Sequence, residues 1–388
     1  MAGLPDSRYA TNKMILEGNT YNMESEALLS KPDPDGASAR KIVREEVPYE
    51  NLSKKYLLWK DKDVTRQYFK MYGTRLEKAR PVVEAKAKAK WGSKVPLKRL
   101  FELDEGSGRS IVVGTLFKRQ ELKPSILKEI SEEHHLVPQP IAERYVSDDD
   151  EIILEDELQR IQLVSNLEVP KLVTGITCAV LGIERVGGKF EVEDICFAGL
   201  PDPIKREVIE ENRFVLFVSG IELSNCVDSL LPLELLVDYV TGLLGCPTEQ
   251  AAVSKICRVI IAGNSISSAK GEKSKTDKAK LVKELDDILM QLSSLCPVDV
   301  MPGEFDPANH ILPQQPLHRC MFPKASKYTT MQSVANPYEF VVGGRMMIGM
   351  SGQNVKDIQR CSTLEDPIEI LESLCKWGHL APTAPDTL

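Results

Sequence analysis

Apolar and polar residues in the middle of the chain alternate in short runs, which is the pattern of half-buried β-strands. Five such runs cover residues 110–118, 151–157, 160–165, 172–183 and 189–198. The last two runs flank Gly187-Gly188, a pair that favours a tight hairpin turn. The pattern therefore predicts a compact set of five strands.

A stretch with helical spacing separates the first two of these strands. It opens at Pro124, and it places Ile126, Leu127 and Ile130 on one side of a helix. Five short strands with such an insertion favour a small β-barrel of the OB type over a β-sandwich, although spacing by itself leaves both open.

A longer helical pattern precedes the strands, over residues 64–91. Its apolar face consists of Tyr68, Phe69, Tyr72 and Leu76. Pro81 is expected to break or restart this helix, because proline lacks the backbone N–H that the helix needs. The following Lys86, Lys88 and Lys90 could form a DNA-contacting patch, but alternating alanine and lysine favours a solvated helix face.

After Pro201 strands and helices alternate, which indicates a layered α/β domain. The predicted elements are strands at 214–219, 258–262 and 298–301, helices at 232–244, 278–295 and 368–377, and a hairpin around Gly343-Gly344. The helix at 278–295 is strongly amphipathic, so its leucine-rich face belongs to the core and does not form a cofactor site.

These elements divide the chain into three parts. Residues 1–55 mix Asp, Glu, Ser, Asn and Pro without apolar periodicity and are expected to form a disordered arm. Residues 56–200 are expected to hold a helical lead-in and the barrel, and residues 201–388 the layered domain. The predicted fold class is thus α+β or α/β, with a β-barrel followed by a layered α/β domain.

Composition narrows the range of partners and compartments. The chain has 388 residues, a formal net charge of −8 and a pI near 5.4, so it has no overall attraction for a phosphate backbone. Nine cysteines are scattered without a Cys-x-x-Cys pair, and no run reaches the ~20 apolar residues that span a bilayer. We expect a soluble intracellular protein with reduced thiols and protein partners.

The turns that end the strands of the layered domain have the shape of a metallophosphoesterase site without its ligands. In such enzymes the turns carry Asp-x-His, Gly-Asp-x-x-Asp and Gly-Asn-His-Asp or Gly-Asn-His-Glu, then His-Gly and Gly-His-x-His. Here the degenerate positions are Gly220 and Glu222, Asn264 and Ser267, Glu304, Phe305 and Asp306, and Ser351 in place of the histidine of His-Gly. The sequence ends before any Gly-His-x-His occurs.

The missing ligands matter because two divalent ions about 4 Å apart repel each other by roughly 16 kcal/mol at an effective dielectric near 20. Anionic ligands must offset this repulsion, and a phenyl ring such as that of Phe305 binds no metal. We therefore expect no catalysis, no cofactor and no metal. Two alternatives stay open: a single Mg²⁺ site formed by Glu222, Glu304 and Asp306, and a residual metal-dependent phosphodiesterase activity.

Other candidate sites are weaker. His310, His318 and Cys320 match no zinc spacing, so they are interpreted as surface or interface residues. His134-His135 suits the negative end of a predicted helix and needs no catalytic role. No serine elbow, phosphate-binding loop or Cys-His nucleophile pair occurs in the sequence.

The barrel raises a third hypothesis, binding of single-stranded DNA, which needs aromatic platforms beside a positive groove. Between Arg109 and Val164 the aromatic residues are Phe117 and Tyr145, and the stretch 148–157 is mostly acidic. A Lys-rich loop near residues 270–280 could contact DNA, but Ser, Gly and Lys together favour a solvated insertion. The sequence therefore opposes this hypothesis.

Several longer strings carry a family resemblance. They include Val112-Val113-Gly114-Thr115-Leu116-Phe117-Lys118, the run 153–161, the Pro302 turn, Leu312-Pro313-Gln314-Gln315-Pro316 and Ser351-Gly352-Gln353-Asn354-Val355. With an OB-like barrel ahead of degenerate phosphoesterase turns, the chain resembles the B-subunit family of replicative DNA polymerases, and within it the accessory subunits of DNA polymerase delta. The resemblance covers residues 66–388.

The resemblance implies a nuclear, non-catalytic scaffold used in DNA replication, repair and translesion synthesis. It implies contact with the cysteine-rich C-terminal tail of the polymerase delta catalytic subunit and with the third, clamp-binding subunit. It also implies sharing with the catalytic subunit of polymerase zeta, and contact with DNA only through the complex. Family members continue past Leu388 into further strands, so the last domain is expected to be incomplete here and to expose an unpaired edge.

Overall fold

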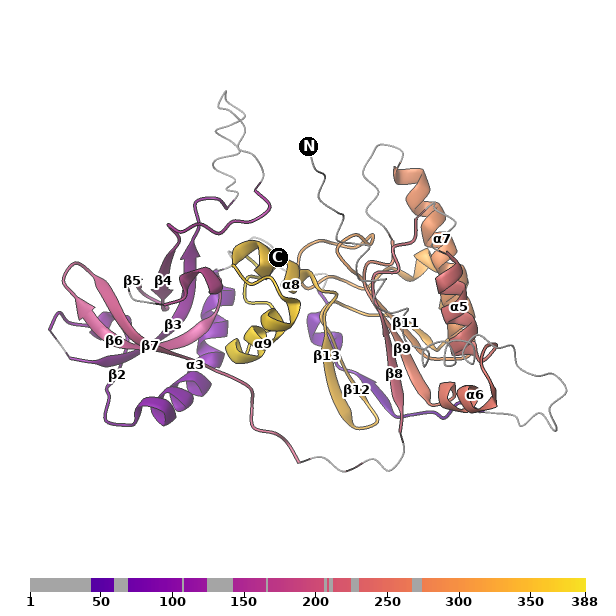
Figure 1. Cartoon of the computed structure of the whole chain (residues 1–388), viewed down its shortest axis with the longest axis horizontal. Coiled ribbons are helices and arrows are strands. Elements are labelled where there is room, and N and C mark those ends of the chain that lie inside the picture. Colours follow the sequence, from indigo (N-terminus) through magenta and orange to yellow (C-terminus); the bar gives the residue numbers. More distant parts are fainter. Residues whose placement is uncertain are drawn as a thin grey trace, which may run out of the picture. The chain divides into compact units, whose positions relative to one another are not determined.

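The computed structural model describes residues 43–58, 69–106, 108–123, 142–164, 167–205, 208, 212–224, 230–266 and 274–388 (Figure 1). The chain forms two compact units, and each is discontinuous in sequence. The barrel unit combines residues 59–206 with 352–388, and the layered unit combines residues 1–58 with 207–351. None of the described helices is long and apolar enough to cross a membrane.

The barrel unit is built on a closed β-barrel. Its strands are β3 (Ser110–Arg119), β4 (Glu151–Glu155), β5 (Arg160–Val164), β6 (Thr177–Arg185) and β7 (Lys189–Phe197). They pair in the order β3-β4-β5-β7-β6, and β6 pairs with β3 to close the barrel; a short strand β2 (Leu97–Lys98) adds to β3. The five predicted strands are confirmed, and the closure excludes the sandwich.

Helices cover the barrel at two places. One face of α3 (Phe69–Trp91) places Leu76, Val83 and Ala87 against the outward-facing Ile111 and Val113 of β3. The helices α8 (Gln353–Cys361) and α9 (Pro367–Trp377) contribute Ile358, Ile370 and Trp377 to the same apolar cluster as the barrel interior. Short 3₁₀ turns at Leu100–Glu102 and Val169–Lys171 complete the unit.

The layered unit has three layers. Its parallel sheet runs β11-β10-β9-β8, with β8 (Phe214–Val218), β9 (Ile256–Ala262), β10 (Val298–Met301) and β11 (Met331–Ser333). An antiparallel sheet contains β1 (Tyr49–Asn51), β12 (Tyr338–Val342) and β13 (Arg345–Gly349). The helices are α5 (Leu230–Thr241), α6 (Pro247–Val253) and α7 (Ser274–Ser293), and 3₁₀ turns lie at Ser53–Tyr56, Arg319–Met321 and Ala325–Lys327.

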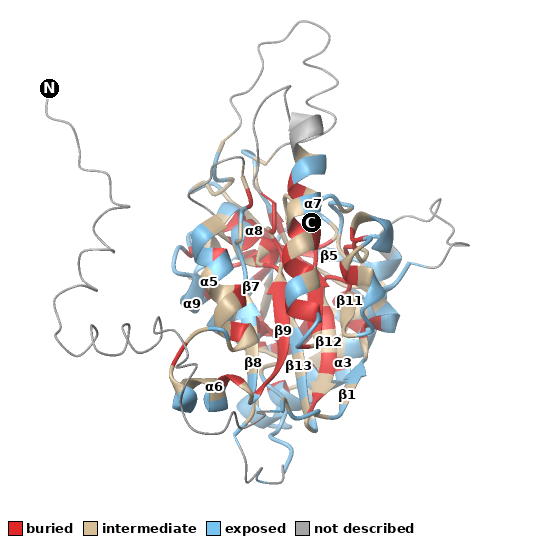
Figure 2. Ribbon diagram, turned by 90° about the vertical axis from the view of Figure 1, so that its right-hand side faces the viewer, coloured by how far each residue is buried: buried red, intermediate tan, exposed pale blue. Residues whose placement is uncertain are grey.

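Alternation along β9 explains the layering. Val259 and Ile261 pack with α5 and α7, whereas Ile260 packs with Tyr338 and Phe340 of the antiparallel sheet. Figure 2 shows β9 buried along its length, as expected for a strand that is covered on both faces. The predicted helix–strand alternation after residue 201 is confirmed, and α7 buries its leucine-rich face as expected.

The prediction of a disordered arm is wrong for residues 43–55, which form ordered contacts with the rest of the layered unit. Residues 1–42 lie outside the described residues. β1 pairs with β12, and Ser53 exchanges hydrogen bonds with the backbone of Glu339. The Arg44 guanidinium donates to the carbonyls of Val240 at 2.7 Å, Val253 at 3.1 Å and Ile256. These contacts join residues about 200 to 290 positions apart, so local composition gives no sign of them.

Two further expectations change. The compact units differ from the predicted division at residue 200, because residues 352–388 belong with the barrel, whose apolar cluster α8 and α9 share. Helix α3 runs through Pro81 without a break. Burial of Leu76 and Val83, on either side of the proline, offsets the lost backbone hydrogen bond. The predicted helix at Pro124 and His134-His135 lie outside the described residues.

Candidate functional site

The carboxyl ends of β8, β9 and β10 bring three of the degenerate turns together. The Gly220 N–H donates to the Gly263 carbonyl at 3.2 Å, and the Glu222 N–H donates to the Asn264 carbonyl at 3.0 Å. The Phe305 N–H reaches the Asn264 side-chain oxygen at 3.4 Å. Parallel strands end at the same edge of a sheet, so five of the predicted site residues meet there. They are Gly220, Glu222, Asn264, Phe305 and Asp306.

The turns approach so closely that glycine is needed at two positions. A Cβ on Gly303 would lie 2.2 Å from the backbone nitrogen of Asn264, and a Cβ on Gly263 would lie 2.6 Å from the Cβ of Ser351. The Ser351 hydroxyl donates to the Pro302 carbonyl at 2.6 Å. Ser351, predicted to occupy the place of a metal-binding histidine, therefore ties a fourth turn to the cluster.

Two non-glycine residues keep a left-handed backbone in these turns. Glu222 has φ 48° and Asn264 has φ 52°. Such angles cost energy for side chains other than glycine and persist where the surrounding structure enforces them. The surrounding contacts thus hold a strained backbone at both positions.

Asp306, the one acid that the enzyme pattern retains, is turned into the protein. The residue is 3% exposed, and its two carboxylate oxygens accept hydrogen bonds from the Gly303 N–H at 2.8 Å and the Ile266 N–H at 3.1 Å. Burial raises the pKa of this carboxyl, while the same backbone amides oppose that shift. Asp306 therefore holds two turns together through their backbones.

The other two carboxylates of the open magnesium alternative lie differently. Glu222 is exposed and Glu304 is partly buried. Among the described residues no group of three or more His, Cys, Asp or Glu side chains is arranged to hold a metal ion. Ser267, the eighth predicted site residue, lies outside the described residues.

A second pair of polar residues supports the turns, and sequence reasoning assigned it no role. The buried Gln314 amide donates to the Gly303 carbonyl at 3.0 Å, and the buried Asn336 amide donates to the Gln314 side chain at 2.8 Å. Asn336 also accepts from the Ser351 N–H at 3.4 Å. Gln314 belongs to the Leu312–Pro316 string, which carried the family resemblance without indicating this contact.

The histidines of the Pro-Gln loop stay near the surface. His310 is exposed, and His318 places its Nδ1 atom 2.8 Å from the Cys320 sulfur. Cys320 is exposed as well. This placement agrees with the interpretation of these residues as surface residues.

Comparison with known proteins gives two family matches, one before and one after residue 200. A family model described as the DNA polymerase delta subunit OB-fold domain matches residues 67–195. A second family model, for the B-subunit of DNA polymerases alpha and epsilon, matches residues 215–388. These two matches together cover most of the described chain.

Curated relatives carry names that agree with these matches. The DNA polymerase delta small subunit of Oryza sativa subsp. japonica is 40% identical over 355 residues, which cover 89% of this chain and 82% of the relative. DNA polymerase delta subunit 2 of Drosophila melanogaster is 40% identical over 359 residues with the same coverage. The DNA polymerase delta small subunit of Arabidopsis thaliana is 37% identical, covering 89% of this chain and 80% of the relative. The chain therefore belongs to the family of DNA polymerase delta small subunits, with an OB-fold domain ahead of a domain of the polymerase B-subunit type.

Proposed function

We propose that the chain is a non-catalytic scaffold of the polymerase delta complex in the nucleus. In this role it bridges the cysteine-rich C-terminal tail of the catalytic subunit to the third, clamp-binding subunit during DNA replication and repair. The same surface would serve the catalytic subunit of polymerase zeta. A phosphoesterase-like domain that no longer turns over substrate provides the rigid frame for these contacts.

The observation that carries the proposal is the position of Asp306. A carboxylate that ligates metal must point its lone pairs at the ion, whereas both oxygens of Asp306 face backbone N–H groups. At the positions of the expected enzyme ligands, the side chains of Asn264 and Ser351 join turns by hydrogen bonds. We call the packed turns around Gly220, Asn264, Gly303 and Ser351 the strand-end cluster. Its contacts favour a structural role over a catalytic one.

The density of contacts at the cluster also supports a scaffold. Four turns from distant parts of the layered unit are joined by Gly263, Gly303, Asn264 and Ser351 without space for a methyl group at either glycine. Well-packed turns limit local opening, and a surface that does not rearrange loses less entropy when a partner binds. Permanent subunit interfaces commonly bury more than ~2,000 Å², and they need such a frame.

Co-purification tests the proposal directly. The full chain is co-expressed with the C-terminal tail of the polymerase delta catalytic subunit and isolated through a tag on the tail. We expect a stoichiometric complex that persists at high salt, because obligate interfaces are apolar at their centre. Failure of the folded chain to associate with the tail contradicts the proposal.

Two assays on the isolated chain address the alternatives. Hydrolysis of bis(p-nitrophenyl) phosphate with added Mn²⁺ tests for phosphodiesterase activity, and turnover that disappears in Asp306→Ala would replace the scaffold proposal with a catalytic one. A salt-dependent affinity of the isolated chain for single-stranded oligonucleotides would favour the OB-fold binder instead. We expect neither signal above background.

A further inference from the structure

The barrel unit contains a pocket of about 470 Å³ at the start of helix α3. Its walls come from the first turns of α3, the outer face of β3 and the β4–β5 hairpin. Farther along α3, Leu76 and Val83 cover the outward side chains of β3, but Thr115 and Phe117 lie beyond that cover and line the pocket. The pocket is of the size that takes a small ligand or the anchor of a peptide.

Thr115 has an unsatisfied hydroxyl at this wall. The residue is 8% exposed, and its Oγ1 atom has no hydrogen-bond partner among the described residues. Most buried side-chain polar atoms are hydrogen-bonded, because leaving one unpaired costs free energy. A ligand group in the pocket that donates a hydrogen bond would satisfy it.

Acceptor groups outnumber donor groups in the pocket wall. Four carboxylates line it, at Glu155, Asp156, Glu157 and Asp386, against the two cations Lys70 and Arg160. Burial, Asp386 and Glu155 together raise the pKa of the wall residue Tyr72 to about 12, against an opposing effect of Arg75. The wall therefore favours a ligand that is rich in donors and positively charged.

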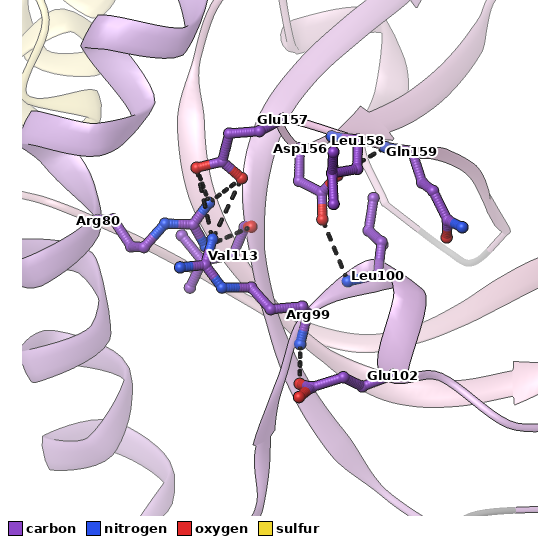
Figure 3. Close-up of polar contacts among 9 residues, drawn as sticks. All are labelled: Arg80, Arg99, Leu100, Glu102, Val113, Asp156, Glu157, Leu158 and Gln159. Carbon is purple, nitrogen blue, oxygen red and sulfur yellow. Dashed lines mark hydrogen bonds and ion pairs between the residues drawn. The ribbon is translucent and has the colours of Figure 1, made fainter.

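The carboxylates differ in how far they are already paired. Glu157 forms ion pairs with Arg80 at 2.7 Å and Arg99 at 3.1 Å, as Figure 3 shows. Neither arginine lines the pocket. Asp386 pairs with Lys123. Within the described part of the chain, Glu155 has only the exposed Arg160 at 3.4 Å, and Asp156 accepts backbone N–H groups of Leu100, Leu158 and Gln159 without an ion pair. Glu155 and Asp156 are thus the carboxylates in the pocket wall that can pair with a bound cation.

We propose that this pocket binds an arginine side chain of a protein partner. The planar guanidinium can lie against the aromatic ring of Phe117 while its N–H groups donate to Glu155, Asp156 and the Thr115 hydroxyl. A lysine has three donors on a single point charge and fits such a spread of acceptors less well. The inference concerns the barrel unit and does not depend on the turn cluster of the layered unit.

Ligand-observed NMR on the full chain tests the chemistry with a defined probe. N-acetyl-arginine methylamide is titrated against the protein, and N-acetyl-citrulline methylamide, which has nearly the same shape without the charge, serves as the matched ligand. We expect millimolar binding of the arginine probe, in keeping with its small size, and at least roughly tenfold weaker binding of citrulline.

Variants then locate the site. Thr115→Val keeps the shape and removes the unpaired hydroxyl, so the isolated chain should be as stable as before or more stable while the probe binds roughly threefold to tenfold more weakly. Glu155→Gln should weaken the probe roughly tenfold. Glu191→Gln is the control, because Glu191 pairs with Arg185 within the β6–β7 hairpin as Glu155 pairs with Arg160 within the β4–β5 hairpin. It should leave binding unchanged.

Three results overturn the proposal. One is no binding of the arginine probe by the folded chain, and another is equal binding of the citrulline probe. The third is arginine binding that Thr115→Val and Glu155→Gln leave intact, since the probe would then occupy some other surface.

Discussion

The role of Asp306 leads to the most decisive prediction, because a ligand and a structural link respond differently to its removal. In Asp306→Ala the buried N–H groups of Gly303 and Ile266 lose their acceptor. Each orphaned N–H costs about 1–3 kcal/mol, and removal of the buried carboxylate returns part of this, which leaves a net loss of about 2–4 kcal/mol. The layered unit should therefore lose a large share of its stability.

Hydrogen exchange followed by mass spectrometry is the suitable assay. The three tryptophans stand at 59, 91 and 377, all within the barrel unit, so the layered unit has no tryptophan to report on its unfolding. Peptides covering β9 and β10 should exchange roughly a hundredfold faster in Asp306→Ala, since about 1.4 kcal/mol corresponds to tenfold. Glu234→Gln removes an exposed carboxylate from α5 of the same unit and serves as control.

One outcome refutes this reasoning: protection of β9 and β10 in Asp306→Ala that equals protection in Glu234→Gln. The carboxylate would then hold nothing together, and its inward position would have no energetic consequence. Asp306→Asn should fall between the two, because the amide offers one acceptor oxygen in place of two and turns a donor toward a backbone N–H.

Three further perturbations test other parts of the fold. Gly303→Ala should lower the free energy of unfolding by more than about 2 kcal/mol, because its Cβ would lie 2.2 Å from a backbone atom. Gly349→Ala, whose Cβ meets nothing within 4 Å, should change it by less than about 1 kcal/mol. Equal hydrogen-exchange rates in the two variants would contradict the close approach at Gly303. Lys118→Met should destabilise the barrel unit by about 3–5 kcal/mol, because it leaves the buried Asp150 carboxylate, 3.2 Å from the lysine, without its ion-pair partner. The double variant with Asp150→Leu should recover most of this stability in urea unfolding followed by fluorescence. An unchanged unfolding midpoint in the single variant would contradict the buried pair. Burial lowers the pKa of His379 to about 4, below its unfolded value near 6.5. The neutral imidazole therefore contributes to the free energy of unfolding above pH 6.5, and this contribution, at most about 3 kcal/mol, is lost as pH falls toward 4. His379→Gln should remove this pH dependence, and identical pH profiles in the two proteins would contradict the explanation.

Local patterns of apolar residues were enough to predict much of the architecture. Alternation located the five barrel strands between Ser110 and Phe197, and 3.6-residue spacing located α7 and α9. These signals are reliable because strand and helix periodicity follow from backbone geometry, and each face is either covered or solvated. The residue types Asn264, Phe305 and Ser351 were also readable directly, and they led to the prediction that the ligand set of a metallophosphoesterase is missing.

Contacts between distant residues became visible only in the folded chain. Arg44 reaches carbonyls about 200 positions away, and β1 adds to a sheet whose other strands lie beyond residue 337. Local composition made this segment resemble a disordered arm, because its partners are not its neighbours in sequence. The same reason hid the packing of α8 and α9 with the barrel.

The strand-end cluster shows this division most clearly. Its residue types identified Asp306 as an acid in a phosphoesterase-like turn, but they left open whether that acid faces an ion or the protein. The fold set the direction of its carboxylate, because β9 and β10 bring the N–H groups of Ile266 and Gly303 to it from turns about 40 positions apart. A side chain's type can be read from the sequence, but its hydrogen-bond partners depend on which backbone segments the sheet places beside it.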